Sequence, residues 1–173
     1  MKKRINKKGQ EVMGMSFGVI FSIFLIVFFI VITLIVIKAF LGQKDCAEVG
    51  IFIDRLKTEV KKSWNSNSGT YLFKGNVPSK LEYICFANVS GDPTIESSSQ
   101  MWRDLTLYVG KNANIFFYPA EKACEMPYHY IPHLDLGEII SSDNPLCIPV
   151  NKGKVSFEVE KKRGSGLVQI NKK

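Results

Sequence analysis

The sequence predicts an α+β fold, in which a single long N-terminal helix packs on a small antiparallel β-sheet domain. Three features support this prediction. An uncharged apolar run lies near the N-terminus, a helical pattern of apolar residues then continues to Trp64, and short β-favouring segments separated by loops follow from residue 65. The first two features belong to one helix, and the third supplies the sheet.

The apolar run lies between Glu11 and Lys38, where 26 consecutive residues carry no charge. As a helix this run is about 39 Å long, which exceeds the roughly 30 Å hydrocarbon core of a bilayer. The apolar region of a cleavable secretory signal is shorter, about 7–15 residues, and small residues at a cleavage site follow it. We therefore predict a retained transmembrane helix over residues 10–41, in contact with membrane lipid.

The distribution of charge predicts the orientation of this span in the membrane. Residues 1–9 form a basic leader with five positive charges, whereas residues 42–173 hold 17 basic and 15 acidic side chains. Because positive flanks stay in the cytoplasm, we expect a single-pass protein of the cell membrane with its N-terminus inside and its C-terminal part outside. The small excess of positive charge beyond the span also argues against a nucleic-acid-binding protein, so no nucleic-acid partner is expected.

Residues 42–64 are expected to continue the span as an amphipathic helix. Apolar side chains recur there at steps of three and four residues: Val49, Ile53, Leu56, Val60 and Trp64. The opposite face is charged, and Arg55 with Glu59 and Glu59 with Lys62 have the spacing of ion pairs. No proline lies between Glu11 and Trp64, so we predict one continuous helix with one stripe buried against the rest of the chain.

Residues 65–173 form the predicted β-rich exported domain. Its strand candidates are 71–73, 81–87 and 115–118. Residues 101–109 fit either a short helix or a strand. The stretch 119–149 contains five prolines, so we expect mostly loops there, with a helical turn near 134–140. A C-terminal hairpin is predicted from alternation over 155–159, a turn at 161–166 and a returning strand at 167–170.

All four cysteines, Cys46, Cys85, Cys124 and Cys147, follow the span. An even number of cysteines outside the membrane favours disulfides, whose three possible pairings the sequence leaves open. The gaps between successive cysteines lack the short pairs of a closed zinc site. Asn88-Val89-Ser90 is a candidate glycosylation sequence.

The exported part of the sequence holds no pattern typical of an active site. Residues 42–173 contain no G-x-S-x-G nucleophile elbow, phosphate-binding loop, H-E-x-x-H or C-x-x-C, so we expect no enzyme, catalytic residue or cofactor. Cys124, His129 and His133 lie close together in the sequence and suggest a metal site as an alternative. Pro127 and Pro132 prevent the regular helix that would align the two imidazoles, so loop histidines and no metal are the expectation.

The tetrapeptide Lys7-Lys8-Gly9-Gln10, followed by the apolar helix, resembles the prepilin-type (class III) leader of archaeal type IV pilin-like proteins. The resemblance implies that a prepilin-type peptidase cuts between Gly9 and Gln10 and that the helix remains in the mature chain. It also implies other pilin-like subunits as partners. One position departs from the family: Gly14 stands at the fifth mature position, where a Glu that helps dock the next subunit is common.

Small residues at Gly14, Gly18 and Ser22 form a strip on one face of the predicted span. Such strips let helix backbones approach closely in lipid, although glycine is also simply frequent in transmembrane helices. Together with the leader, the strip favours a pilin-like subunit or minor pilin of an archaeal cell-surface filament, which acts by assembly and adhesion. The alternative is a membrane-anchored extracytoplasmic binding or scaffold module that does not polymerise.

Overall fold

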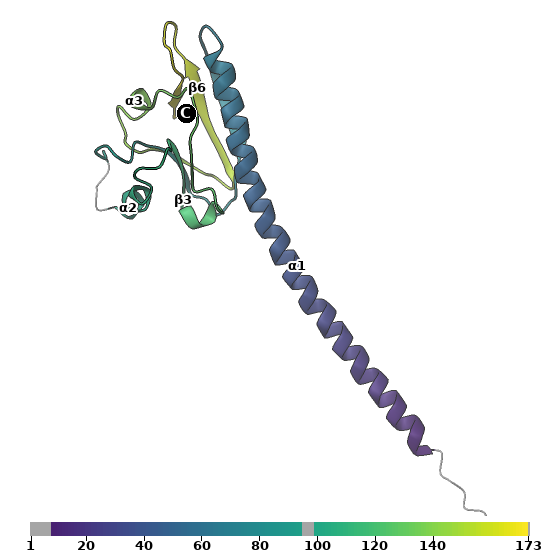
Figure 1. Ribbon diagram of the computed structural model, residues 1–173. Coiled ribbons are helices and arrows are strands. Elements are labelled where there is room, and N and C mark those ends of the chain that lie inside the picture. The colour runs from purple at the N-terminus through teal and green to yellow at the C-terminus, as the bar shows by residue number, and fades with distance from the viewer. Residues whose placement is uncertain (1–7, 95–98, 173) are drawn as a thin grey trace, which may run out of the picture. The chain divides into compact units, whose positions relative to one another are not determined.

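The computed structural model describes residues 8–94 and 99–172, and for residues 8–17 and 41 it describes the backbone alone. The elements in chain order are α1 (Lys8–Trp64), β1 (Gly69–Asn76), β2 (Tyr83–Phe86), α2 (Gln100–Thr106), β3 (Ile115–Tyr118), the 3-10 helix η1 (Ala120–Lys122), β4 (Tyr128–His129), α3 (Leu136–Ile139), β5 (Leu146–Pro149), β6 (Lys154–Lys161) and β7 (Gln169–Asn171) (Figure 1). The chain divides into two compact units, Met1–Gln43 and Lys44–Lys173. We call the second unit the folded domain.

The folded domain contains two antiparallel sheets, where the sequence had led us to expect one. The first has the strand order β1-β6-β7, with Phe73 opposite Phe157 and Val159 opposite Ile170. The second has the order β4-β3-β2-β5, with Ile84 of β2 between its partners on β3 and β5. The α+β class and the long helix packed on antiparallel sheet are confirmed.

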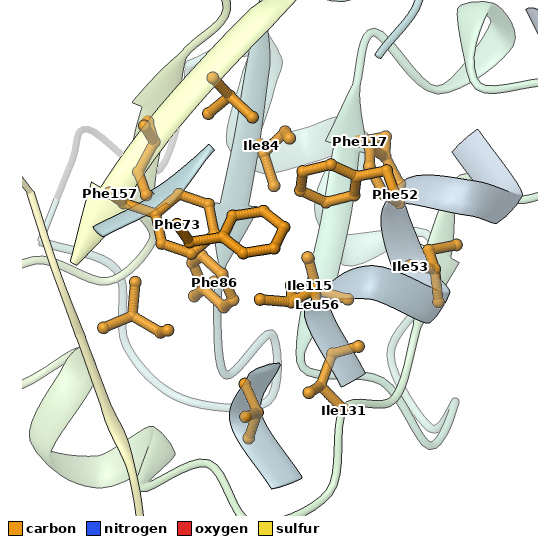
Figure 2. Packing of buried hydrophobic residues seen from close by; sticks show 14 of the residues in the cluster. Phe52, Ile53, Leu56, Phe73, Ile84, Phe86, Ile115, Phe117, Ile131 and Phe157 are labelled. Carbon is orange, nitrogen blue, oxygen red and sulfur yellow. The ribbon is translucent and has the colours of Figure 1, made fainter. Parts of the chain in front are cut away.

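One stripe of α1 forms the centre of the main core. Its buried positions are Val49, Phe52, Ile53, Leu56 and Val60. Phe52 makes edge-to-face contacts with Phe73 of the first sheet at 5.5 Å and with Phe117 of the second at 5.8 Å (Figure 2). Gly75 makes room for this ring, because a Cβ there would lie 2.5 Å from Phe52. The same side chain of the helix therefore packs against both sheets.

The predicted stripe is correct except at its end. Trp64 is 38% exposed, and its ring stacks on His133 with the ring centroids 3.9 Å apart. Its Nε1 donates to the carbonyl of Gly166 at 3.0 Å. Trp64 therefore holds the end of the helix to two loops instead of filling the core.

The charged face of the helix follows the prediction only in part. Lys62 and Glu59 form an ion pair at 3.8 Å. Arg55 does not pair with Glu59; its guanidinium donates to the carbonyl of Lys74 at 3.1 Å and lies over the ring of Phe73. The predicted pairing considered only neighbours on the helix, whereas the partner of Arg55 is a backbone carbonyl of β1.

The second sheet is buried on both faces. Ile84 and Phe86 of β2 point into the main core, whereas Cys85 belongs to a smaller cluster with Trp102 and Leu105 of α2. This helix settles the open choice for residues 101–109. Its N-cap is Ser99, whose hydroxyl accepts a hydrogen bond from the backbone N–H of Trp102 at 3.3 Å.

The stretch 119–149 is more regular than predicted. It contains β4, α3 and β5, and β5 forms an edge of the second sheet. The prolines do not prevent this, because Pro145 precedes the strand and Pro149 is its last residue, so no internal ladder N–H is lost. The turn predicted near 134–140 is α3, and the predicted C-terminal hairpin is β6 with β7.

The buried stripe yields a first prediction. Leu56→Asp should lower the free energy of unfolding of the folded domain by roughly 4 kcal/mol or more, because it replaces a fully buried leucine by an unpaired charge. Protease resistance and thermal unfolding of the full chain in detergent would measure the loss. Ile51→Asp, on the same helix but 58% exposed, is the matched control. Equal effects of the two variants would contradict the packing of this stripe.

Candidate functional site

Between Gly18 and Ile37, α1 carries no charge and is predominantly apolar on all its sides. Every side chain described from Gly18 to Phe40 is exposed, and Phe24 and Phe40 retain 64% and 69% of their accessible surface. Among the described residues, one helix is long and apolar enough to cross a membrane, and this segment belongs to it. Exposed apolar area on this scale is unfavourable in water, so the segment needs lipid or other apolar chains around it.

The predicted small-residue strip is partly within the described side chains. No atom of the chain lies within 4 Å of the position that a Cβ would take at Gly18. The hydroxyl of Ser22 donates to the carbonyl of Gly18 at 2.8 Å, so this polar group is satisfied inside its own helix. The helix surface at Gly18 is therefore open to the backbone of another helix. The side-chain surroundings of Gly14 lie outside what is described.

The leader lies at the margin of the described chain. Residues 1–7 are outside it, and Gly9 and Gln10 are described only as backbone of α1. The predicted cleavage between these two residues is therefore not tested by the geometry.

The first disulfide joins Cys46 of α1 to Cys124, which follows η1. The two Cα atoms are 5.5 Å apart, and 78 residues separate the cysteines in the sequence. Cys46 lies close to the N-terminal end of the folded domain, so this bond ties the start of the amphipathic stretch to the loops beside the second sheet.

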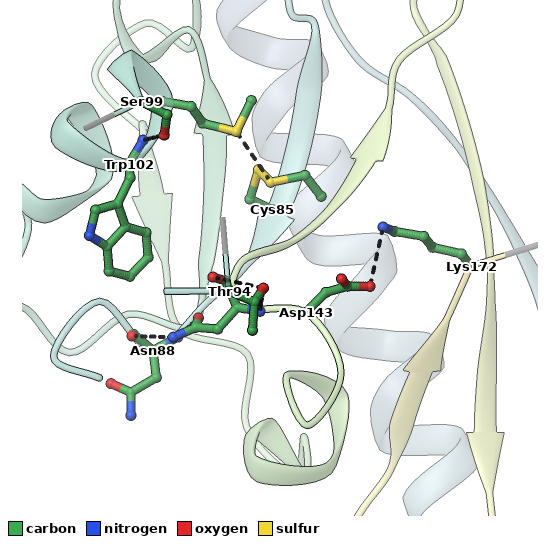
Figure 3. The surroundings of a disulfide bond; sticks show 10 residues. Cys85, Asn88, Thr94, Ser99, Trp102, Asp143 and Lys172 are labelled. Atoms are coloured by element: carbon green, nitrogen blue, oxygen red, sulfur yellow. Dashed lines mark hydrogen bonds and ion pairs between the residues drawn. A yellow bond between two sulfur atoms is a disulfide. The ribbon is translucent and has the colours of Figure 1, made fainter. Parts of the chain in front are cut away.

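The second disulfide joins Cys85 of β2 to Cys147 of β5, which stand opposite each other in the sheet (Figure 3). Cys85 has no exposed surface, and Met101 Sδ lies 3.6 Å from Cys147 Sγ. The bond fixes the edge strand β5 to the sheet on the face that α2 covers. The four cysteines thus form two intramolecular disulfides, and no described cysteine is free.

The histidines take separate places. Cys124 is oxidised in a disulfide and is not a thiolate ligand, while His133 stacks on Trp64. His129 lies in β4, where burial and then the positive charge of Lys57 lower the pKa of its imidazole, against a smaller opposing effect of Asp54. In the part of the chain that is described, no group of three or more His, Cys, Asp or Glu side chains is placed to hold a metal ion.

The candidate glycosylation residue Asn88 is exposed and lies just after β2. Its side-chain oxygen accepts a hydrogen bond from the backbone N–H of Ser90 at 3.1 Å, which closes a local turn across the Asn-Val-Ser sequence. Buried Asn144 holds this turn in place, since its amide donates to the carbonyl of Asn88 at 3.1 Å (Figure 3). The same amide donates to the carbonyl of Asp92 at 2.9 Å. The acceptor amide of Asn88 therefore stands on a fixed turn at the surface.

A basic groove is the feature that the sequence analysis missed. It lies beside β1 and the turn between β5 and β6, and its cations are Arg55, Lys74, Lys152, Lys154 and Lys172. These residues come from segments as far apart in sequence as α1 and the C-terminus, so no local spacing connects them. The short motif Asn151-Lys152-Gly153-Lys154 is the one signal that local sequence offered.

No family model matches the chain, and neither the curated proteins nor the solved structures yielded a match to it. The functional argument therefore depends on the features of the chain itself. These are a bare apolar helix segment, a folded domain with two disulfides, and a groove rich in lysine.

The two bonds give a second prediction. Non-reducing peptide mapping should recover Cys46 linked to Cys124 and Cys85 linked to Cys147, with no free thiol. Replacing either pair by alanine should lower the free energy of unfolding by about 2–4 kcal/mol, since each bond restricts the unfolded chain. Chemical denaturation of the two double variants would measure this. Recovery of any other pairing would contradict the assignment.

Proposed function

We propose that this chain is a pilin-like subunit or minor pilin of an archaeal cell-surface filament. It acts by assembly and adhesion, not by catalysis. In this proposal the membrane holds the precursor with its N-terminus in the cytoplasm and its folded domain outside, and a prepilin-type peptidase removes residues 1–9.

One observation carries the proposal: a single helix, α1, is uncharged and exposed over residues 18–37 and buried along one stripe over residues 49–60. A helix that served only as a core element would need no such segment before the folded domain. In α1 this segment is almost wholly apolar, with Ser22 and Thr33 bonded to carbonyls of their own helix. Such a segment suits lipid before assembly and the packed helices of a filament core afterwards.

The disulfides support the placement outside the cytoplasm. Both bonds lie in the folded domain, and disulfides persist in oxidising surroundings. The excess of basic residues before the span favours the same orientation, since five of them lie within residues 1–9.

The glycine at position 14 supports a second candidate function. Without a Glu at the fifth mature position, one contact that pilin-like subunits commonly use for docking is missing. The second candidate is therefore a single-pass anchored binding or scaffold module that never polymerises. The two candidates differ in whether the leader is removed and in whether the apolar helix meets another helix.

Leader removal is the third prediction. Intact-mass measurement on protein from native membranes or sheared surface fractions should show a chain that begins at Gln10, because the basic run and Gly9 precede the apolar helix as in prepilins. Gly9→Val should block this processing. Mature protein that still carries residues 1–9 would favour the anchored module.

Helix association is the fourth prediction. Gly18→Leu should reduce crosslinked oligomers in membranes while leaving insertion intact, because leucine is favourable in lipid but keeps neighbouring backbones apart. Val27→Leu is the control, since nine residues along a helix places it on the opposite face. If the two variants give the same crosslinked species as the unmodified chain, the span is an anchor and the binding-module function should replace the filament.

A further inference from the structure

The basic groove is a concave surface of the folded domain with a volume of about 1320 Å³. Arg55 reaches it from α1 and Lys74 from β1, while Lys152, Lys154 and Lys172 come from the C-terminal third of the chain. Five of its twelve lining residues are basic and none is acidic. In contrast, residues 42–173 as a whole carry 17 basic and 15 acidic side chains, so the groove concentrates one sign of charge.

Three of these charges have no counter-ion among the residues that the structure describes. Lys74, Lys152 and Lys154 are exposed, and among the residues described here none of the three forms an ion pair. Lys172 forms an ion pair with Asp143, which is not among the lining residues, with Nζ 3.8 Å from the carboxylate oxygen (Figure 3). Arg55 is held in place by its hydrogen bond to the carbonyl of Lys74. The field inside the groove is therefore positive and not neutralised by its own walls.

The turn that carries two of the lysines is tightly specified. Asn151 and Lys154 exchange backbone hydrogen bonds of 2.8 and 3.0 Å around a two-residue turn. Both central residues have positive φ, +50° at Lys152 and +74° at Gly153, as such hairpin turns require. Glycine, asparagine and aspartate are the usual residues there, and lysine rarely adopts this backbone. Lys152 nevertheless has this backbone conformation, and its side chain lines the groove.

Gly153 fixes where the turn lies. A Cβ at this residue would stand 2.8 Å from the carbonyl oxygen of Val77, and Val77 donates its N–H to the carbonyl of Gly153 at 2.9 Å. The turn is thus held against the segment that follows β1. Lys152 and Lys154 therefore project from a turn whose backbone is already fixed. This lowers the entropic cost of ordering them when a ligand binds.

The rest of the lining indicates the chemistry of the ligand. Asn76, Asn151 and Ser156 are exposed and offer hydrogen bonds to hydroxyl groups. Ile148 and Val155 are only 4% and 3% exposed, so Pro149 is the one exposed apolar side chain among the lining residues, and a peptide would find no series of apolar pockets for alternate side chains. No aromatic residue lines it, so bases of a single-stranded nucleic acid would find no stacking surface. Anionic groups and hydroxyls together are the features of an acidic polysaccharide.

We propose that the basic groove binds a carboxylate-bearing polysaccharide at the outer surface of cells. Sugar carboxylates would meet the lysine ammonium groups, and sugar hydroxyls would bond to the exposed amides and Ser156. This assignment deepens the adhesive part of the proposed function and depends on the domain lying outside the cytoplasm. Because the groove is open and its lysines are exposed, binding is expected to be multivalent and sensitive to salt.

The test uses the full-length chain in neutral detergent micelles and polygalacturonate as the probe, with dextran as the uncharged polymer. Calorimetry should detect polygalacturonate binding that weakens at least about tenfold between low and high salt, with no binding of dextran. The double variant Lys152→Glu and Lys154→Glu should weaken binding about tenfold or more, since two favourable contacts become repulsive. Lys111→Glu, an exposed site outside the groove, should leave affinity unchanged.

A second measurement uses the unmodified chain and does not depend on how the variants fold. Bound polygalacturonate should protect Lys74, Lys152 and Lys154 from acetylation, but not Lys111, as read by mass spectrometry. The proposal is overturned if polygalacturonate does not bind, if groove lysines are not protected, or if polyglutamate or single-stranded DNA binds more tightly. None of these results alters the leader and crosslinking tests, so failure of the groove and failure of the filament proposal remain distinguishable.

Discussion

The packing of Phe52 between two sheets is the contact on which the rest of the folded domain depends. Its ring meets Phe73 on one side and Phe117 on the other, and Gly75 leaves the space that it occupies. The two sheets also meet directly through Phe86 and Phe157, whose ring centroids are 5.8 Å apart, and Phe52 joins the helix to this shared apolar surface. The disulfide from Cys46 holds the helix less than two turns earlier, so the stripe that begins at Val49 starts from a fixed position.

The second disulfide, Cys85–Cys147, stabilises the second sheet and not the helix. The sheet that contains β2 is covered by the main core on one face and by α2 on the other, yet the smaller cluster has six buried residues, whereas the main core has 23. Cys85 and Cys147 cross-link adjacent strands on that weaker face. Since α2 is only seven residues long, it has little intrinsic stability, and its burial of Trp102 needs a rigid sheet beneath it. The covalent bond supplies this rigidity where apolar area is limited.

The sequence was informative where periodicity extends over many residues. The span, the stripe and the C-terminal hairpin follow from repeated spacing, and the two faces of β2 are visible in the alternation of Ile84 and Cys85. It was less informative where structure depends on partners far along the chain. The strand β5 was hidden among prolines because only its pairing with β2 stabilises it, and Arg55 met a carbonyl of β1 instead of Glu59.

The candidate sites differ in the same way: some could be predicted from the sequence, and others depend on tertiary structure. The disulfide-forming residues could be named from composition and expected location, but the pairing of Cys46 with Cys124 depends on tertiary structure and was left open. The groove could not be predicted at all, since its cations converge from segments separated by as many as 117 positions, between Arg55 and Lys172. Like charges brought together in this way repel one another, so folding alone gives no reason to gather them. A domain that nearly balances its charge overall, yet collects five cations and no carboxylate along one groove, is therefore better explained by an anionic ligand than by its own stability.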